Sequence, residues 1–269
     1  MTGPLSERTG GFVAHEHLRD SQKEMILDGI QVLSDDGFLL AAAPTGIGKT
    51  AAALASVLEI SRNSSERLQI MFLTGRQSQH RIVIETIRLI NSRLSEGVSH
   101  VKVVDIIGRE SMCEYVDRGT GKCNCEEDVI EGSRVERREE LREMILTYPT
   151  HVDDVISRSR QRKMCAWASA RSAVKSCDLI VCDYNHVFVE NVRTNSLAPM
   201  GIDLENVILI IDEAHNLPDR IRNGLERRAT MSIFRDSKIE LEEFLGEKEK
   251  EAKQLDLDTD QGSLNIEGI

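Results

Sequence analysis

The chain has few aromatic residues and no long apolar run. Aromatic side chains make up 4% of its 269 residues and include one tryptophan, Trp167. No stretch approaches the about 20 apolar residues that cross a bilayer. The opening residues, MTGPLSERTGGF, also lack the apolar centre of a secretory signal peptide. We therefore expect a cytoplasmic protein that makes no membrane contact.

An excess of basic residues is also missing. The net charge of −11 argues against a surface that wraps duplex DNA as a whole. A local basic groove remains compatible with this charge, because salt screens exposed charges beyond about 8 Å. One such run, from Arg158 to Arg171, contains no acid.

Six cysteines stand out in a chain of this class. Cytosolic proteins rarely form disulfides, so clustered cysteines there indicate metal binding or redox chemistry. Cys177 and Cys182 flank or lie in an apolar segment, which favours a place in the core. The other four are the candidates for chemistry: Cys113, Cys123, Cys125 and Cys165.

Short apolar runs alternate with helical patterns, which predicts an α/β fold with a doubly wound parallel sheet. We expect strands at residues 38–43, 69–74, 101–107, 178–182 and 207–211. We expect helices at residues 17–33, 50–61, 77–94 and 163–176. Residues 108–162 are polar and charged, which indicates an insertion. The chain is helical and charged after residue 224, and residues 256–269 have too few apolar residues for a core, which predicts a mobile end.

A glycine-rich segment follows the first predicted strand and opens a helix, which is the setting of a phosphate-binding loop. It consists of Ala43, Pro44, Thr45, Gly46, Ile47, Gly48, Lys49 and Thr50. Backbone N–H groups and the helix dipole favour phosphate there. We expect Lys49 to contact the β- and γ-phosphates of ATP and Thr50 to bind Mg²⁺. A chance Gly-Lys-Thr turn is the alternative, and a second ATP motif disfavours it.

That second motif is the aliphatic run Val207–Ile211 followed by Asp212, Glu213, Ala214 and His215. A buried parallel strand delivers such acids to the edge of the sheet where ligands bind. We expect Asp212 to hold Mg²⁺, Glu213 to act as general base and His215 to couple the site to the rest of a motor. An ordinary strand before a helix with acidic caps is the alternative.

The two motifs together resemble those of the XPD-type helicases of superfamily 2, over most of residues 15–224. The resemblance implies a RecA-like first motor domain made of residues 1–107 and 163–224. It implies an iron–sulfur insertion at 108–162 and the start of a helical arch domain at 225–269. Gln22, in Arg19–Gln22, would read adenine, with a solvated helix face as the alternative. The segment Asp183–His186 also resembles a family segment, of less certain role.

The resemblance also implies nucleic-acid contacts. Arg76 and Gln77, in Thr74–Gln79, would contact a single strand, with an ordinary helix cap as the alternative. A basic run would help to hold DNA, with a solvated face as the alternative; its members are Arg158, Arg160, Arg162 and Lys163. Trp167 and Tyr115 are candidates for stacking on a base, although a lone aromatic usually packs.

By the same resemblance, Cys113, Cys123, Cys125 and Cys165 would ligate a [4Fe–4S] cluster. The Cys123-x-Cys125 pair is tighter than the family's C-x₂-C spacing, and Ala166 stands where the family has proline. The tighter spacing leaves the exact ligand set open. A zinc site with four cysteines, or no metal, is the alternative.

The function implied by the resemblance is that of an ATP-dependent 5′-to-3′ DNA helicase in DNA repair, acting on single strands and duplex junctions. A second motor domain needs on the order of 150 residues, and fewer follow His215. We therefore expect weak or no ATP turnover by this chain alone, because that missing domain carries the arginine finger. The main alternative is a non-motor module that binds single-stranded nucleic acid, with iron–sulfur or zinc and a vestigial or regulatory ATP site. A P-loop phosphotransferase is a third, less favoured alternative.

Overall fold

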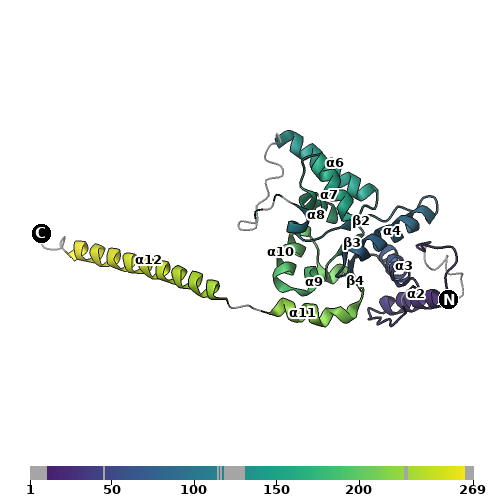
Figure 1. The fold of residues 1–269 in the computed structure, drawn as a ribbon, viewed down its shortest axis with the longest axis horizontal. Coiled ribbons are helices and arrows are strands. Elements are labelled where there is room, and N and C mark those ends of the chain that lie inside the picture. The colour runs from purple at the N-terminus through teal and green to yellow at the C-terminus, as the bar shows by residue number, and fades with distance from the viewer. Residues whose placement is uncertain are drawn as a thin grey trace. The chain divides into compact units, whose positions relative to one another are not determined.

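The computed structural model describes residues 11–44, 46–113, 115, 117, 131–226 and 230–263. The chain divides into two compact units, Met1–Gly224 and Leu225–Ile269. The first unit contains every strand of the described residues and both predicted ATP motifs (Figure 1). The second unit contains the helix α12, Met231–Ser263, which continues through the first part of the expected mobile end. The last six residues of that end lie outside the described residues.

In the described residues the sheet has four parallel strands in the order β2-β3-β1-β4. They are β1 (Gln69–Leu73), β2 (Val103–Asp105), β3 (Leu179–Cys182) and β4 (Val207–Ile211). Each coincides with a predicted strand or lies within one, and β4 has the predicted bounds. The predicted parallel α/β sheet is thus confirmed.

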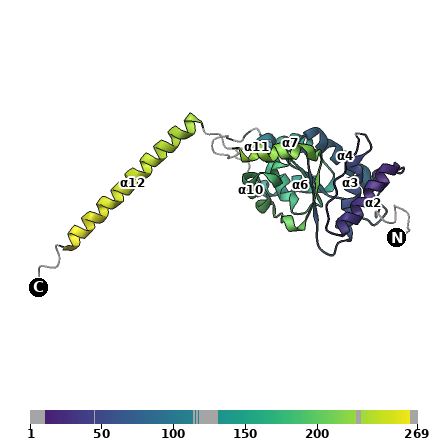
Figure 2. The same cartoon turned by 90° about the horizontal axis from the view of Figure 1, so that it is seen from below.

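Alternate side chains of the strands enter two separate hydrophobic clusters, as the strand's period of two requires. Phe72 and Val181 lie in the cluster with α3 (Lys49–Asn63) and α4 (Gln77–Arg93). Met71 and Ile180 face the other way, toward the helices on the opposite side (Figure 2). Those helices are α6 (Glu131–Thr147), α7 (Val152–Gln161), α8 (Ala166–Val174) and α10 (Glu190–Met200). The sheet is therefore a middle layer with helices on both sides.

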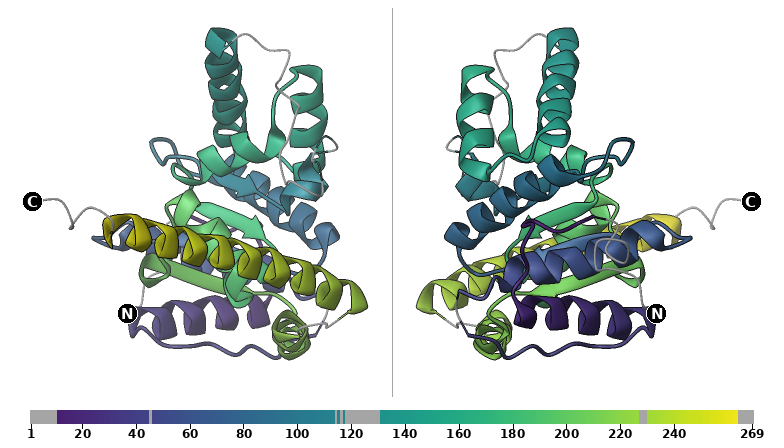
Figure 3. Two further views of the ribbon diagram at one scale, coloured as in Figure 1. Left: turned by 90° about the vertical axis from the view of Figure 1, so that its left-hand side faces the viewer. Right: turned by 90° about the vertical axis from the view of Figure 1, so that its right-hand side faces the viewer.

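The expected insertion contributes directly to this core. Its described helices are α5 (Arg109–Met112), α6 and α7. Leu141 and Ile145 of α6 and Val155 of α7 are buried in the same cluster as Met71 and Ile180. Figure 3 shows these teal helices on the side of the sheet away from the purple helix α2 (Asp20–Ser34). The helices of residues 131–161 therefore cover the sheet.

The predicted strand at residues 38–43 is wrong. The segment is extended but joins no strand of the described sheet. Phe38 is 100% exposed and Leu40 is 89% exposed. The helices α2 and α3, which precede and follow the segment, pack on each other through Ile26, Ala52 and Ala55. An apolar run suits a strand or an extended connection equally, and the pattern alone does not distinguish them.

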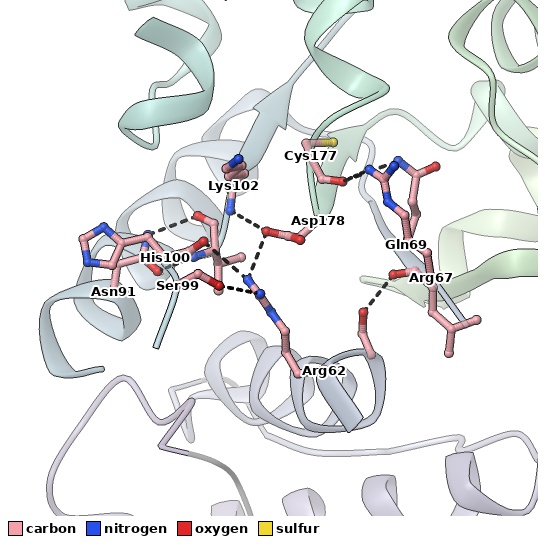
Figure 4. A network of polar contacts seen from close by, with 12 residues as sticks. Arg62, Arg67, Gln69, Asn91, Ser99, His100, Lys102, Cys177 and Asp178 are labelled. Carbon is pink, nitrogen blue, oxygen red and sulfur yellow. Dashed lines mark hydrogen bonds and ion pairs between the residues drawn. The ribbon is translucent and has the colours of Figure 1, made fainter. Parts of the chain in front are cut away.

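A polar network lies at the end of the sheet where the strands begin (Figure 4). Asp178 accepts hydrogen bonds from Arg62 Nη2 at 3.1 Å and from the Lys102 amide at 2.8 Å. Arg67 Nη2 donates to the carbonyl oxygens of Lys175 and Cys177 at 2.9 and 3.2 Å. These contacts join α3 and the start of β1 to the start of β3, so the polar residues at this end of the sheet have a structural role.

The remaining elements connect these parts. The short helix α9 (Asn185–Phe188) follows β3, and the 3₁₀ turns η1 (Leu204–Asn206) and η2 (Ala214–Asn216) flank β4. Helix α11 (Leu217–Leu225) follows η2. Among the described residues, no helix has the length and apolar character to span a membrane.

Candidate nucleotide site

The predicted ATP residue Asp212 and two polar residues from other strands lie where the strands end. Thr74 follows β1, Tyr184 follows β3 after one residue, and Asp212 follows β4 directly. Parallel strands bring their carboxyl ends to one edge, which is where ligands bind in open α/β sheets. The Asp212 amide donates to the Leu73 carbonyl at 2.9 Å, so β4 stays in register with β1 as the acid emerges.

The glycine-rich loop leads directly into α3, with Gly48 as its N-cap. Gly46 and Gly48 have φ of 83° and 87°, a left-handed conformation that favours glycine. Lys49 Nζ donates to the Ala43 carbonyl at 3.1 Å, so the lysine folds back across the loop. The first N–H groups of α3 are the donors that a phosphate would meet. Thr45 lies outside the described residues.

Helix α2 holds this loop from one side. Gln22 is 5% exposed and its Oε1 accepts the Arg19 amide at 3.0 Å. Its Nε2 lies 2.1 Å from the position that a Cβ on Gly48 would occupy, so a larger residue at position 48 would clash. Arg19 Nη1 donates to the Gly46 carbonyl. The solvated-face alternative for Gln22 is therefore wrong.

Asp212 is half-buried and only partly satisfied. Its Oδ2 is buried and has no hydrogen-bond partner among the described residues. Burial raises the pKa of this carboxyl and the Glu213 charge raises it further, while Lys49 and a hydrogen bond from Thr74 lower it. A divalent cation would offset both raising effects and satisfy Oδ2. Asp212 on β4 and Thr50 on α3 thus provide the oxygen ligands that Mg²⁺ prefers.

Glu213 and His215 form the outer part of the site. Glu213 has φ 49° and ψ 47°, a strained conformation for a residue other than glycine. Its Oε2 lies 3.3 Å from His215 Nδ1, and the His215 side chain is largely exposed. The acid therefore stands at the mouth of the site with one oxygen next to the imidazole.

Three residues of the site were given no role by sequence reasoning: Arg19, Thr74 and Tyr184. The Tyr184 hydroxyl donates to the Asp212 carbonyl, and burial raises the pKa of this phenol. Thr74 lowers the pKa of the Asp212 carboxyl, and Arg19 Nη1 donates to the Gly46 carbonyl of the loop. Thr74 and Tyr184 stand just after strand ends, and that position was the signal in the sequence.

Two predicted cluster ligands are described and both are buried. Cys113 follows α5, Cys165 is the N-cap of α8, and these two helices contact each other. The Ala168 amide donates to Cys165 Sγ at 3.4 Å. Cys123 and Cys125 lie outside the described residues, and within the described ones no group of three or more His, Cys, Asp or Glu is arranged to hold a metal. The four-cysteine set therefore stays a prediction.

Cys177 and Cys182 lie in the core, as predicted. Burial raises the pKa of both thiols, so each remains protonated at neutral pH. Cys177 Sγ also donates to the Val174 carbonyl at 3.2 Å.

The predicted nucleic-acid residues are exposed but form two groups. Arg76 is the N-cap of α4 and Gln77 begins that helix, next to the end of β1. The other group lies at and after the end of α7 and consists of Arg158, Arg160, Arg162 and Lys163. The guanidinium groups of Arg109 and Arg171 lie 5.2 and 4.6 Å from the centre of the Trp167 ring, so this ring already has protein partners. Exposure permits DNA contact by the basic residues and leaves it a prediction.

A protein-family model described as DEAD_2 matches residues 57–232. The ATP-dependent DNA helicase XPD of Sulfolobus acidocaldarius is 27% identical over 222 residues, which cover 80% of this chain and 36% of that protein. The ATP-dependent DNA helicase DDX11 of Danio rerio is 32% identical over 104 residues, covering 39% of this chain and 11% of that one. The chain thus spans about a third or less of these relatives.

Solved structures agree with the fold. A structure titled "Truncated XPD" superimposes with a TM-score of 0.51 at 22% identity, covering 80% of this chain and 57% of that one. Another, titled "XPD_Helicase", gives a TM-score of 0.50 at 23% identity and covers 77% of this chain and 34% of its own. At this identity the likeness establishes the fold alone.

Proposed function

Because the chain belongs to the DEAD_2 family, we propose that it is the ATP-binding part of a DNA helicase that moves along single-stranded DNA. The observation that carries this proposal is the meeting of the glycine-rich loop with Asp212, whose buried Oδ2 lacks a partner among the described residues. An aspartate with a purely structural role would have both oxygens satisfied. The curated relatives named above are DNA helicases by title, which supports the choice of substrate.

In this function the loop and α3 hold the phosphates of ATP, with Lys49 on the β- and γ-phosphates. Thr50 and Asp212 hold Mg²⁺, which supplies positive charge to the phosphate oxygens when bound. Glu213 accepts the proton of the water that attacks the γ-phosphate, and His215 orients Glu213 through their 3.3 Å contact. Gln22 keeps the loop in place through Gly48 and contacts the adenine.

The finer parts of the proposal rest on the sequence resemblance. Arg76, Gln77 and the basic residues from Arg158 to Lys163 bind the phosphates of a single strand. Movement is 5′ to 3′, and the pathway is DNA repair. Cys113, Cys123, Cys125 and Cys165 hold a [4Fe–4S] cluster, whose iron and sulfide content is measurable in protein purified without oxygen. One zinc in place of four irons would overturn the cluster.

The experiment that tests the nucleotide site is titration with a fluorescent ATP analogue in the presence and absence of Mg²⁺. Lys49→Ala should weaken binding at least tenfold, because the loop loses its only side-chain cation. Lys238→Ala, in the exposed helix α12, is the matched control and should bind as the parent does.

Hydrolysis by the chain alone should be weak, because a second motor domain supplies the arginine finger. Single-stranded DNA should raise this residual rate. DNA binding that depends on salt but is indifferent to nucleotide, with no ATP binding, would instead favour a non-motor nucleic-acid-binding module.

A further inference from the structure

A polar cavity lies in the layer formed by the helices α6, α8 and α10. Its volume is about 290 Å³, and its lining includes Arg138 of α6, Ser169 and Arg171 of α8, Lys175 and Pro199. α8 begins at the end of the sheet that carries the nucleotide residues and ends near the start of β3. None of its lining residues belongs to the nucleotide site, so the cavity is a separate feature.

Positive charge converges on this cavity although the chain as a whole is acidic. Arg138, Arg171 and Lys175 all line it. Within the described residues no carboxylate pairs with Arg171 or Lys175. The one acid in the lining, Glu139, is already paired with Arg142. The field inside the cavity is therefore positive.

One buried group points to a ligand. Ser169 is 1% exposed, and its Oγ has no hydrogen-bond partner among the described residues. A buried hydroxyl without a partner is unfavourable, because it has lost water and gained nothing. An anion in the cavity would accept the Ser169 hydroxyl hydrogen and restore that bond.

An arginine that also lines the cavity is held in place. The Arg171 guanidinium stacks 4.6 Å from the centre of the Trp167 ring. Stacking on an aromatic ring leaves the N–H groups along the guanidinium edge able to donate. Arg171 thus provides fixed donors and Ser169 a buried one, while the Lys175 side chain is exposed and adjusts around a ligand.

We propose that this cavity binds a phosphate group as a dianion, either free phosphate or the terminal monoester of a nucleic-acid end. Arg171 and Lys175 have no carboxylate partner among the described residues, and two positive charges favour a dianion over the single charge of a backbone phosphodiester. The volume of about 290 Å³ is enough for a phosphate with part of its hydration shell. The site does not depend on the proposed helicase function.

The test uses the full chain in a buffer without phosphate or sulfate, with the Lys49→Ala substitution present to remove phosphate binding at the glycine-rich loop. Inorganic phosphate should raise the melting temperature and give a saturable calorimetric titration. Lys175→Gln should weaken that binding at least tenfold. Lys238→Gln is the matched control and should leave it unchanged.

The Ser169→Ala substitution gives a second test. Its effect on the melting temperature without phosphate and its effect on the gain caused by phosphate should have opposite signs. Without phosphate the substitution should raise the melting temperature, because it removes an unpartnered buried hydroxyl. With phosphate it should reduce the gain in melting temperature. A merely structural serine would lower both values, and that result would overturn the proposal.

The source of the phosphate is distinguished by short single-stranded oligonucleotides with and without a terminal phosphate. Stronger binding of the phosphorylated oligonucleotide, lost in Lys175→Gln, assigns the site to a nucleic-acid end. Binding of inorganic phosphate without that difference assigns it to the free ion. Absence of both effects, or phosphate binding that Lys175→Gln leaves intact, would overturn the proposal.

Discussion

The two edge strands of the sheet, β2 and β4, are both mostly aliphatic and have opposite surroundings. All three residues of β2 are buried, covered by α4, α6 and α8. Every residue of β4 is at least partly exposed, and Leu209 is 38% exposed. Each strand is associated with an aspartate: Asp105 ends β2 and Asp212 follows β4.

The two aspartates differ as their strands do. Asp105 Oδ1 lies 2.6 Å from His80 Nδ1, and its Oδ2 accepts the Val152 amide at 2.8 Å. Asp212 keeps a buried oxygen without a partner among the described residues. The acid at the covered edge therefore joins α4 to α7, while the acid at the open edge has an oxygen that no described residue satisfies. Sites that bind ligands often lie in the less stable parts of a protein.

Replacing each aspartate should give the largest effects and should distinguish the two roles. Asp105→Ala should cost about 3–5 kcal/mol of unfolding free energy, because it leaves His80 and the Val152 amide without their buried partner. Asp212→Asn should leave the free protein as stable or more stable, because it removes a poorly solvated charge, while weakening Mg²⁺-dependent nucleotide binding. Urea unfolding and nucleotide titration measure the two quantities.

The sign for Asp212 follows from its raised pKa. A raised folded-state pKa stabilises the fold below the unfolded value and loses that contribution as pH rises through the folded value. The amide avoids this loss at neutral pH. The exposed Asp153, which pairs with Arg81 at 3.2 Å, is the control, and Asp153→Ala should cost under about 1 kcal/mol. Equal losses at Asp105 and Asp153 would contradict the comparison.

A second pair of substitutions compares the sheet's centre with its open edge. Met71 lies between Ile180 of β3 and Leu209 of β4 in the sheet. Ile180→Ala should cost about 2–5 kcal/mol, the range for truncation of a buried aliphatic residue. Leu209→Ala should cost less than half as much, because its side chain already contacts solvent. Similar losses in urea unfolding would mean that another segment covers β4.

The sequence predicted most of this arrangement. Hydrophobic periodicity located the four strands and the helices α3, α4 and α8, because each of these has a regular apolar pattern. It missed α10, and it missed α6 and α7 because residues 108–162 read as a polar insertion although Leu141 and Ile145 lie in the core. The partners of Asp105 were not predictable, because His80 and Val152 come from distant parts of the chain. The exposed edge of β4 was equally hidden, since five aliphatic residues in a row are typical of a strand buried on both sides.

The buried histidine His186, on α9, should make stability depend on pH. Burial lowers its pKa and His80 lowers it further, while Asp183 raises it. The unfolded chain therefore takes up a proton more readily, so stability is present above about pH 6.5 and falls as the pH drops below it. His186→Gln should flatten the curve between about pH 7 and pH 5, and the exposed His17→Gln should not.

The smallest effect is expected at the apolar segment that was predicted as a strand. Leu40 is 89% exposed and joins no strand of the described sheet, so Leu40→Ser should change the unfolding free energy by less than about 0.5 kcal/mol. Leu54→Ser in α3, where the side chain is fully buried, should abolish or severely reduce stability. If Leu40→Ser instead costs several kcal/mol, the segment lies against the open edge of β4 in solution. β4 would then be covered as β2 is, and the strand predicted at residues 38–43 would be right. A small loss in the free protein would mean that only the helices α2 and α3 hold residues 38–43 in place.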